Sequence, residues 1–231
     1  MKINENVAML TIGFEGEGSM HPVLVHDGSN LVLIDTGYPR HATQIAEQIS
    51  QAGFDVKDLT HIILTHQDID HVGAVLALME MAGGAVTVAN EVEAPYMDGT
   101  LTPVKLAAAL ARRESESPEE QAHIDKYAQR FAEVHFPVGQ TVTDGQVLSI
   151  AGGIEIVHVP GHTPGHICLF LKKFGIMVIG DAAGVDTDGS LKDFNHMYIQ
   201  DLELSRVSLE KIKTYPIKGL LGHHSGFTSW A

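Results

Sequence analysis

The chain has 231 residues, of which 44% are hydrophobic and 19% are charged, enough apolar material for one large globular domain or a sandwich of two halves. Its formal net charge of −14 argues against nucleic acid as the main partner, since phosphate contacts require clustered Lys and Arg side chains. The N-terminus shows no basic segment followed by a long apolar run, and no apolar run reaches the ~18 residues of a membrane span. We therefore expect a cytoplasmic protein with no membrane partner.

Cysteine use excludes two classes of site. Cys168 is the only cysteine in the sequence, so the chain forms no intrachain disulfide and no thiolate zinc site. The thiol lies within an apolar run, which favours a buried structural role over a nucleophilic one.

The first half of the chain predicts strands and helices joined by short connections. Two apolar runs flank Asp27-Gly28-Ser29-Asn30, a sequence typical of a hairpin turn. Pro39 near the first turn and Gly53 after the last residue delimit a helix. In chain order we predict strands at 6–13, 22–26 and 31–35, a helix from Pro39 to about Ala52, a strand at 60–65, a helix over 72–81 and a strand at 85–88.

Residues 90–135 behave differently and form a predicted helical insert. Two helices, 101–113 and 119–134, are joined by an acidic, turn-rich segment at 114–118. The pair could form a lid, a wall of the substrate site or the surface of a homodimer, or could simply be packing decoration.

Strands return in the second half. We predict strands at 141–143, 146–150, 154–159, 169–171 and 176–179, a helix over 201–215 and a last strand at 219–221. Sheets in both halves with helices outside imply an α/β fold, a four-layer αββα sandwich. We treat residues 1–231 as a single domain that carries the insert at about 90–135.

The segment 65–73 contains a dense group of potential metal ligands. His66, Asp68, Asp70 and His71 lie between the end of a predicted strand and the start of a helix, where open α/β folds place ligands and catalytic groups. Two carboxylates and two imidazoles so close together disfavour one another unless a cation takes up their lone pairs. This donor set suits zinc, iron or manganese. The alternative is a polar, solvated turn that binds nothing.

Three later candidates also follow predicted strands. His162 lies in a stiff Pro-Gly turn, Asp181 follows the strand at 176–179, and His223 follows the last strand. Imidazoles and carboxylates thus end four strands at one rim of the fold, which chance alone hardly supplies.

Other polar residues near these positions have weaker assignments. Asp35 could brace the metal loop or could be a plain turn residue. His166 and His224 could orient ligands, but a structural role is favoured. Tyr198 and Asn195 could donate hydrogen bonds to a developing oxyanion, although a tyrosine there is more often packing.

With these residues in this order, the chain resembles the metallo-β-lactamase superfamily of hydrolases. The resemblance covers essentially the whole chain apart from the insert. It implies two divalent metal ions, with a metal-bound hydroxide between them as the nucleophile. Asp35 matches an early Asp-Thr-Gly turn that has a structural role in the family. The implied ligands are His66 and His162 for one ion and Asp70, His71 and His223 for the other, with Asp181 as the bridge.

One position departs from the family pattern. The family usually has His-x-His-x-Asp-His, and this chain has Asp68 in place of the second His. Asp68 could bind the metal directly and bias its site toward iron or manganese, could reach it through water, or could leave the first site weak. We favour two ions with Asp68 as a ligand, zinc being the first choice and iron or manganese the alternative at that site.

The resemblance implies hydrolysis of a small-molecule substrate, an ester, lactone or thioester, with Asp70 as a catalytic residue that helps return a proton to the leaving group. The acidic charge weighs against the family's nucleases, and a cytoplasmic location against β-lactamase activity. The chain ends soon after His223, which weakens the glyoxalase II interpretation because those enzymes carry an extra C-terminal helical region.

Two other classes of function remain as alternatives. One is a di-iron oxidoreductase related to flavodiiron proteins, which carry a carboxylate at the position of Asp68. This chain, however, has no Cys-x-x-Cys site and no flavodoxin-like region. The other is a non-catalytic domain that holds metal and binds a partner.

Overall fold

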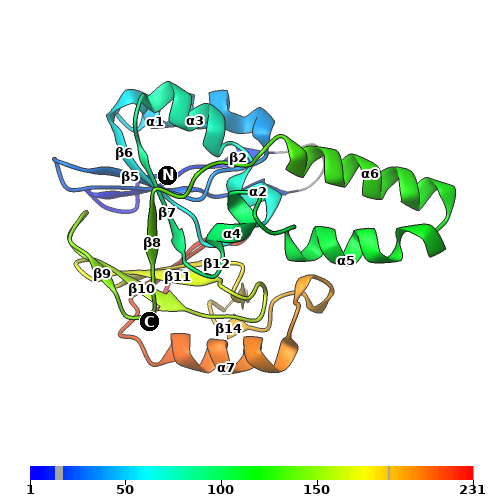
Figure 1. The fold of residues 1–231 in the computed structure, drawn as a ribbon. Helices are drawn as coiled ribbons and strands as arrows, with labels where there is room; N and C mark the ends of the chain where they lie inside the picture. The colour runs from blue at the N-terminus through cyan, green and yellow to red at the C-terminus, as the bar shows by residue number, and fades with distance from the viewer. Residues whose placement is uncertain (14–17, 187, 231) are drawn as a thin grey trace.

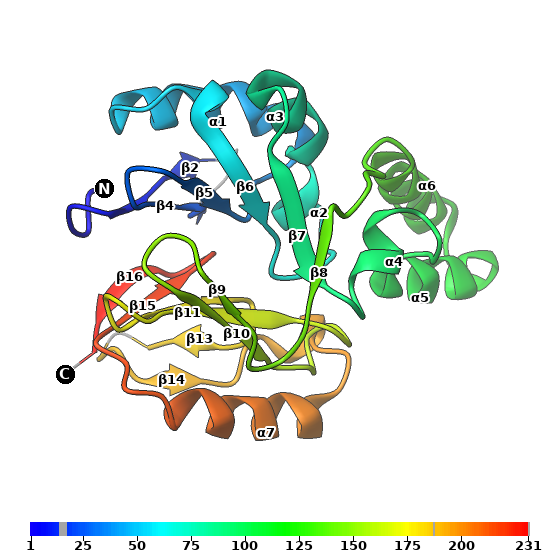
Figure 2. The same ribbon diagram turned by 60° about the vertical axis from the view of Figure 1, so that its left-hand side comes forward.

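The computed structural model describes residues 1–13, 18–186 and 188–230. Two six-stranded sheets are stacked face to face, and helices cover their outer faces (Figure 1). Helices α1 (Ala42–Gln51) and α3 (Val75–Ala82) lie on one side of the stack, and α7 (Leu202–Lys213) lies on the other (Figure 2). The predicted α/β architecture, a four-layer αββα sandwich, is confirmed.

The first sheet is mixed. Its strands are ordered β1-β4-β5-β6-β7-β8, with antiparallel pairing from β1 to β5 and parallel pairing from β5 to β8. The carboxyl ends of parallel strands meet at one edge, so the residues that follow β5, β6 and β7 lie together. The strands are β1 (Val7–Met9), β4 (Val23–His26), β5 (Leu31–Ile34), β6 (Leu59–Ile63), β7 (Val86–Asn90) and β8 (Gln140–Val142).

The second sheet has the order β16-β15-β12-β11-β10-β9. Only β12 and β15 pair in parallel among its described strands, which brings the residues after these two strands side by side. The strands are β9 (Val147–Leu148), β10 (Ile154–His158), β11 (Ile167–Leu171), β12 (Ile176–Gly180), β15 (Gly219–Gly222) and β16 (Gly226–Ser229).

Three apolar layers hold this arrangement together. Ile63 of the first sheet and Leu169 and Val178 of the second belong to the core between the sheets. A second core lies under α1 and α3, and a third lies under α7, where Ile212 is completely buried. Burial at roughly 25 cal/mol per Å² of apolar surface makes these layers the main favourable term in folding.

The predicted helix over 72–81 is wrong in its bounds, because the chain forms two helices, α2 (Ile69–Val72) and α3. Gly73 separates them at a point of close backbone approach. A Cβ on Gly73 would lie 2.5 Å from the carbonyl oxygen of Ile69 and 2.7 Å from that of Gly37. The tight turn fixes where α2 ends, and α2 carries Asp70 and His71.

Several short elements have no counterpart among the sequence predictions. Strand β16 has the turn-like sequence Gly-Phe-Thr-Ser and forms because β15 supplies an edge for it to pair with. The other such strands are β3 (Ser19–Met20), β13 (Gly184–Val185) and β14 (Leu191–Lys192), and the 3-10 turns without a counterpart are Val56–Asp58 and His196–Tyr198. Strand β2 (Ile12–Gly13) is the end of the predicted strand 6–13, the 3-10 turn Pro39–His41 opens the predicted helix at Pro39, and the 3-10 turn Arg113–Ser115 lies where the predicted helix 101–113 meets the turn-rich segment.

The segment 90–135 contains α4 (Ala94–Met97), α5 (Val104–Arg112) and α6 (Pro118–Ala132). Ser117 caps α6 by accepting a hydrogen bond from the Glu120 amide at 3.2 Å. Helices α5 and α6 form a hairpin that projects from one side of the sandwich (Figures 1 and 2). Within the described residues, no helix has the length and apolarity needed to cross a membrane.

Candidate metal centre

The loop after β6 carries the first group of candidate ligands. Asp68 occupies the N-cap position of α2, yet its side chain makes no capping hydrogen bond. Its Oδ2 atom lies instead 3.2 Å from Nε2 of His66 and 3.0 Å from Nε2 of His162. These three residues, which we call the first cluster, offer ligand atoms within 4.8 Å of one another.

A second cluster lies beside the first. It consists of Asp70 and His71 from the start of α2 and His223 and His224 from the end of β15, again with ligand atoms within 4.8 Å of one another. His224 Nε2 lies 3.3 Å from Asp70 Oδ2, and the rings of His71 and His223 are 3.9 Å apart between centroids.

Asp181, which follows β12, lies between the two clusters. Its Oδ1 atom is 3.5 Å from Nε2 of His71, and its Oδ2 atom is 3.6 Å from Nε2 of His162. The carboxylate therefore faces both groups of ligands. The structure brings six of the seven sequence-predicted ligands into the two clusters and places the seventh, Asp181, between them, while their roles as ligands stay predictions.

The two sheets are joined at this point by close contacts. Gly180 has a positive φ of 51°, and a Cβ there would lie 2.8 Å from Thr65 Oγ1 and 2.9 Å from His166 Nε2. The amide of Ile167 also donates a hydrogen bond to the carbonyl oxygen of Thr65 at 3.0 Å. A side chain at position 180 would push the halves of the centre apart.

The centre contains buried polar atoms that lack partners. Nε2 of His66, Nε2 of His71 and Oδ1 of Asp181 are buried and make no hydrogen bond within the part of the chain that the structure describes. Buried polar atoms are almost always hydrogen-bonded, so three orphans facing one point require another partner. A divalent cation satisfies imidazole nitrogens and carboxylate oxygens together, so the residues fit a metal ion.

Electrostatics within the clusters favour available lone pairs. Burial, reinforced by the neighbouring His71, holds the pKa of His66 and of His223 well below the usual value, so both imidazoles are neutral. Burial opposes ionisation of Asp181, but His71 and His224 outweigh it and hold the pKa of Asp181 well below its usual range. The carboxylate is therefore charged although it is buried.

Two histidines hold protons when no metal is bound. Burial opposes their protonation, but nearby carboxylates outweigh it: Asp181 and Asp35 raise the pKa of His71 well above its usual value, and Asp181 and Asp70 raise that of His224 to about 9. A metal ion at the second cluster must displace these protons, so binding releases protons.

Asp35 orients two of the candidate ligands. It accepts hydrogen bonds from the amide and from Oγ1 of Thr65, both at 2.8 Å, and its Oδ2 lies 2.9 Å from Nδ1 of His71. Oγ1 of Thr65 lies 3.0 Å from Nδ1 of His66. These contacts occupy the Nδ1 side of both rings and leave the Nε2 atoms facing the clusters, so Asp35 braces the loop.

Glu93 supports the same loop and was not singled out from the sequence. It is completely buried and accepts hydrogen bonds from the amide and side-chain nitrogen of Gln67, both at 2.9 Å, and from the amide of Gly165 at 2.7 Å. Burial raises the pKa of Glu93. No sequence signal points to this role, because a buried glutamate after β7 has the same local pattern as an exposed one.

His224 and Lys105 differ from their sequence-based interpretation, whereas His166 has the structural role that was favoured for it. His166 Nε2 accepts a hydrogen bond from the Asp181 amide at 3.1 Å, a supporting contact. His224, for which a structural role was favoured, joins the second cluster. Lys105 of α5, assigned no role, donates through Nζ to Asp68 Oδ2 and lies 2.9 Å from Nε2 of His162.

A cavity of about 440 Å³ opens onto both clusters. It combines candidate ligands with side chains of the insert and of the loop before α7. Its lining residues are Tyr38, Asp68, Ile69, Asp70, Lys105, Tyr127, His162, Asp181, Phe194, Asn195, Tyr198 and His224.

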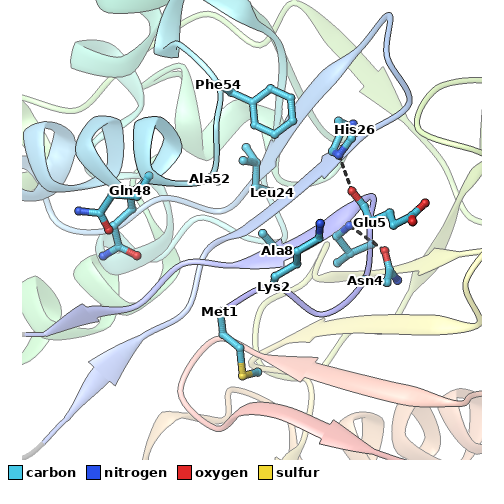
Figure 3. A pocket seen from close by; sticks show the side chains of 12 residues that line it. Met1, Lys2, Asn4, Glu5, Ala8, Leu24, His26, Gln48, Ala52 and Phe54 are labelled. Carbon is cyan, nitrogen blue, oxygen red and sulfur yellow. Dashed lines mark hydrogen bonds between the residues drawn. The ribbon is translucent and has the colours of Figure 1, made fainter.

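A larger cavity, about 560 Å³, lies between the N-terminal strand and α1 (Figure 3). Its polar groups include His26, whose Nε2 atom lies 2.7 Å from the carbonyl oxygen of Glu5, and the side chain of Gln48. None of the predicted ligands lines it. Chemistry rather than size therefore identifies the 440 Å³ cavity as the candidate site.

Known proteins share both sequence and fold with this chain. A probable metallo-hydrolase of Bacillus subtilis, YflN, is 29% identical over 186 residues, which cover 74% of this chain and 66% of the relative. The hydroxyacylglutathione hydrolase GloC of Haemophilus influenzae is 29% identical over 160 residues, covering 67% of this chain and 62% of that protein. The chain thus spans just under two thirds of the length of these relatives.

The same fold is found in solved structures. The crystal structure of a metallo-beta-lactamase family protein from Thermus thermophilus superimposes with a TM-score of 0.75 at 18% identity, covering 99% of this chain and 76% of that one. The family model of the metallo-beta-lactamase superfamily matches residues 17–224. The chain therefore belongs to the metallo-beta-lactamase superfamily.

Proposed function

We propose that this protein is a metal-dependent hydrolase of a small acyl compound, an ester, lactone or thioester. The observation that carries the proposal is Asp181, whose buried carboxylate faces both clusters and leaves Oδ1 without a hydrogen-bond partner. A charged, buried, half-satisfied carboxylate between two groups of imidazoles is suited to hold cations.

Each cluster supplies the donors for one divalent ion. The ion at the first cluster would use His66, Asp68 and His162. The ion at the second cluster would use Asp70, His71 and His223, with His224 as a further donor. Asp181 would contact both ions. Imidazole and carboxylate suit zinc, and the hard oxygen donor of Asp68 also suits iron or manganese. A bound ion supplies Lewis acidity, which polarises a carbonyl group and makes water a nucleophile near neutral pH.

The cavity walls position the acyl group. Tyr127, Phe194 and Tyr198 give the cavity aromatic surfaces, which suit a small organic substrate. Asn195 Oδ1 accepts a hydrogen bond from the Met197 amide at 3.1 Å, which leaves the side-chain NH₂ as a donor. We assign this NH₂ group and the Tyr198 hydroxyl to the carbonyl oxygen, where negative charge develops.

Asp70 is placed to carry a proton. It lines the cavity, and its Oδ2 atom lies 3.3 Å from Nε2 of His224. A carboxylate at this position can take a proton from the attacking water and return it to the leaving group, which makes the leaving alcohol or thiol neutral.

Three further observations support the proposal. The superfamily relatives include a probable metallo-hydrolase and a hydrolase named for an acylglutathione. A cavity of about 440 Å³ lies in the range of ligand sites, roughly 300–1,000 Å³. The net charge of −14 disfavours a nucleic-acid substrate.

The test combines metal analysis with a substrate panel. Purified protein is analysed for metal and assayed against lactones, carboxylic esters, thioesters, phosphodiesters and cephalosporins. We expect turnover of an acyl substrate by the metal-loaded wild type, and loss of both metal and turnover in Asp181→Ala while circular dichroism shows a retained fold. Full activity in Asp181→Ala contradicts the proposal. Bound iron that cycles with a reductant, without hydrolysis, supports the oxidoreductase alternative instead.

A further inference from the structure

We propose that Lys105 makes the two cation sites unequal: its ammonium group occupies the first cluster, so that the first equivalent of divalent metal binds at the second. This inference rests on the proposed function, since it concerns the metal complement of the same centre. It assigns a regulatory role over metal loading to the helical insert.

Lys105 uses the same atoms that a metal ion would need. Its Nζ donates to Oδ2 of Asp68 and lies 2.9 Å from Nε2 of His162. Those two atoms are 3.0 Å apart and belong to the first cluster. A divalent ion bound there would have to displace the ammonium group, because two cations cannot share the same lone pairs.

The insert holds Lys105 in this position. Oε1 of Gln67 accepts a hydrogen bond from the amide of Val104 at 2.7 Å, so residues 67 and 68 of the metal loop pair with residues 104 and 105 of α5. The Lys105 side chain is only 25% exposed. Its Nζ also lies 5.9 Å from the centre of the Tyr198 ring, a cation–π distance. The contact is therefore built into the packing of the insert on the sandwich.

At the second cluster the groups that compete with a metal ion are the protons on His71 and His224, which leave when the metal binds and free the ring nitrogens as ligands. Across the described part of the chain, Asp70 and Asp181 form their close charge contacts with histidines alone. The additional group at this cluster, His224, is an imidazole and so is itself a metal ligand, whereas a lysine ammonium has no lone pair. A metal ion at the second cluster therefore gains His224 as an additional ligand. A metal ion at the first cluster instead meets the positive charge of Lys105.

Lys105 also accounts for the chain's departure from the family motif. A histidine at position 68 would be neutral and could not form an ion pair with Lys105. The Asp68 carboxylate is compensated by Lys105, and this ion pair keeps the first cluster close to neutral without metal. Asp68 and Lys105 therefore act as a unit.

The experiment is a metal titration of the full chain. Metal-free wild type, Lys105→Met and Lys126→Met are titrated with Zn²⁺ by calorimetry and with Co²⁺ by visible absorption. Lys126 is exposed on α6 of the same insert and serves as the matched control. Wild type and Lys126→Met should bind one equivalent tightly and a second roughly 10–100-fold more weakly. Lys105→Met should bind two equivalents with similar affinity.

Three further variants identify the sites and guard against misfolding of Lys105→Met. In the wild-type background, the tight equivalent should persist in His66→Ala and disappear in His223→Ala. Asp68→His, which removes the partner of Lys105 without changing the lysine, should also bind two equivalents of similar affinity.

The outcomes separate this inference from the proposed function. Two equal equivalents in both wild type and Lys105→Met overturn the role of Lys105 and leave the hydrolase proposal standing. A Lys105→Met protein that binds its two metal equivalents with the same unequal affinities as the wild type, but binds anionic acyl compounds more weakly, also overturns it and makes Lys105 a substrate-binding residue. No metal in any variant overturns both proposals.

Discussion

Carboxylates at the two ends of the sandwich differ in burial and in hydrogen bonding. At the end opposite the candidate metal centre, Asp27 in the β4–β5 hairpin accepts hydrogen bonds from the amides of Ser29 (2.9 Å) and Asn30 (2.7 Å), and its second oxygen accepts one from the amide of Ala151 (2.7 Å). Asp27 is exposed, and its two oxygens are engaged by the chain itself.

At the centre, Asp181 is buried and its Oδ1 makes no hydrogen bond to any of the described residues. A carboxylate that stabilises a turn is satisfied by backbone amides, whereas a carboxylate that holds an external cation keeps a lone pair free. The same side-chain type thus contributes to folding at one end and to chemistry at the other.

The largest effect is expected from breaking the second cluster. His223→Ala removes an imidazole that we assign to the tightly bound ion, so kcat/KM for the acyl substrate should fall by about 10³-fold, or about 4 kcal/mol of transition-state stabilisation. Steady-state kinetics and metal analysis check this. His123→Ala is the control, because this histidine is exposed on α6 and lies outside both clusters. Equal loss in both variants would contradict the assignment.

Removing metal from the candidate metal centre should also lower the free energy of unfolding. An ion that binds only the folded chain at a free concentration of 100 Kd raises the free energy of unfolding by about 2.7 kcal/mol. Denaturant unfolding with Zn²⁺ and with a chelator measures the difference in the wild type. Asp181→Ala should show almost no difference, and a difference as large as that of the wild type would argue against its role.

The support that Glu93 gives to the metal loop is tested by Glu93→Gln. The substitution keeps the shape but places an NH₂ group against the donors of Gln67 and Gly165, so the loop loses part of its support. We expect metal affinity to fall by roughly 10–100-fold. Competition with a chelating indicator measures it. Glu91→Gln, at an exposed position in the same segment, should bind metal as the wild type does.

The smallest effect is expected at the opposite end. Burial opposes ionisation of Asp27 slightly, but the amides of Ser29, Asn30 and Ala151 outweigh it and lower its pKa to about 2, below the unfolded value of 3.8. The stability that this adds is present above pH 3.8 and is lost as the pH falls toward 2. Because Asp27 is exposed, the contribution is about 1 kcal/mol or less.

Asp27→Asn tests this contribution. The difference in unfolding free energy between wild type and Asp27→Asn should be constant above about pH 5 and shrink between about pH 4 and pH 2, since the depressed pKa of the wild-type carboxyl is what the variant removes. Glu47→Gln, exposed on α1, provides the comparison. If the difference in unfolding free energy stays unchanged down to about pH 2, the charge of Asp27 adds nothing to stability. Metal binding should be unaffected in both variants.

Local sequence accounts for most of the fold. Apolar runs of strand length, a turn sequence at 27–30 and the Pro39 and Gly53 helix boundaries predicted the main strands and helices, because hydrophobic periodicity and turn chemistry act over a few residues. Elements that depend on a neighbour were missed. Strand β16 forms on the edge of β15, and α2 and α3 separate at Gly73, where Gly37 comes close.

The order of residues along the chain also identified which side chains could hold metal. His66, Asp70, Asp181 and the other candidates follow predicted strands, and the carboxyl ends of parallel strands lie at one edge of a sheet. How that set is completed depends on contacts between distant segments. Lys105 meets Asp68 across 37 residues, and Glu93 meets Gln67 across 26. Local patterns do not encode such contacts: a buried charge and an exposed one look alike in the sequence, and the packing of distant segments decides which it is.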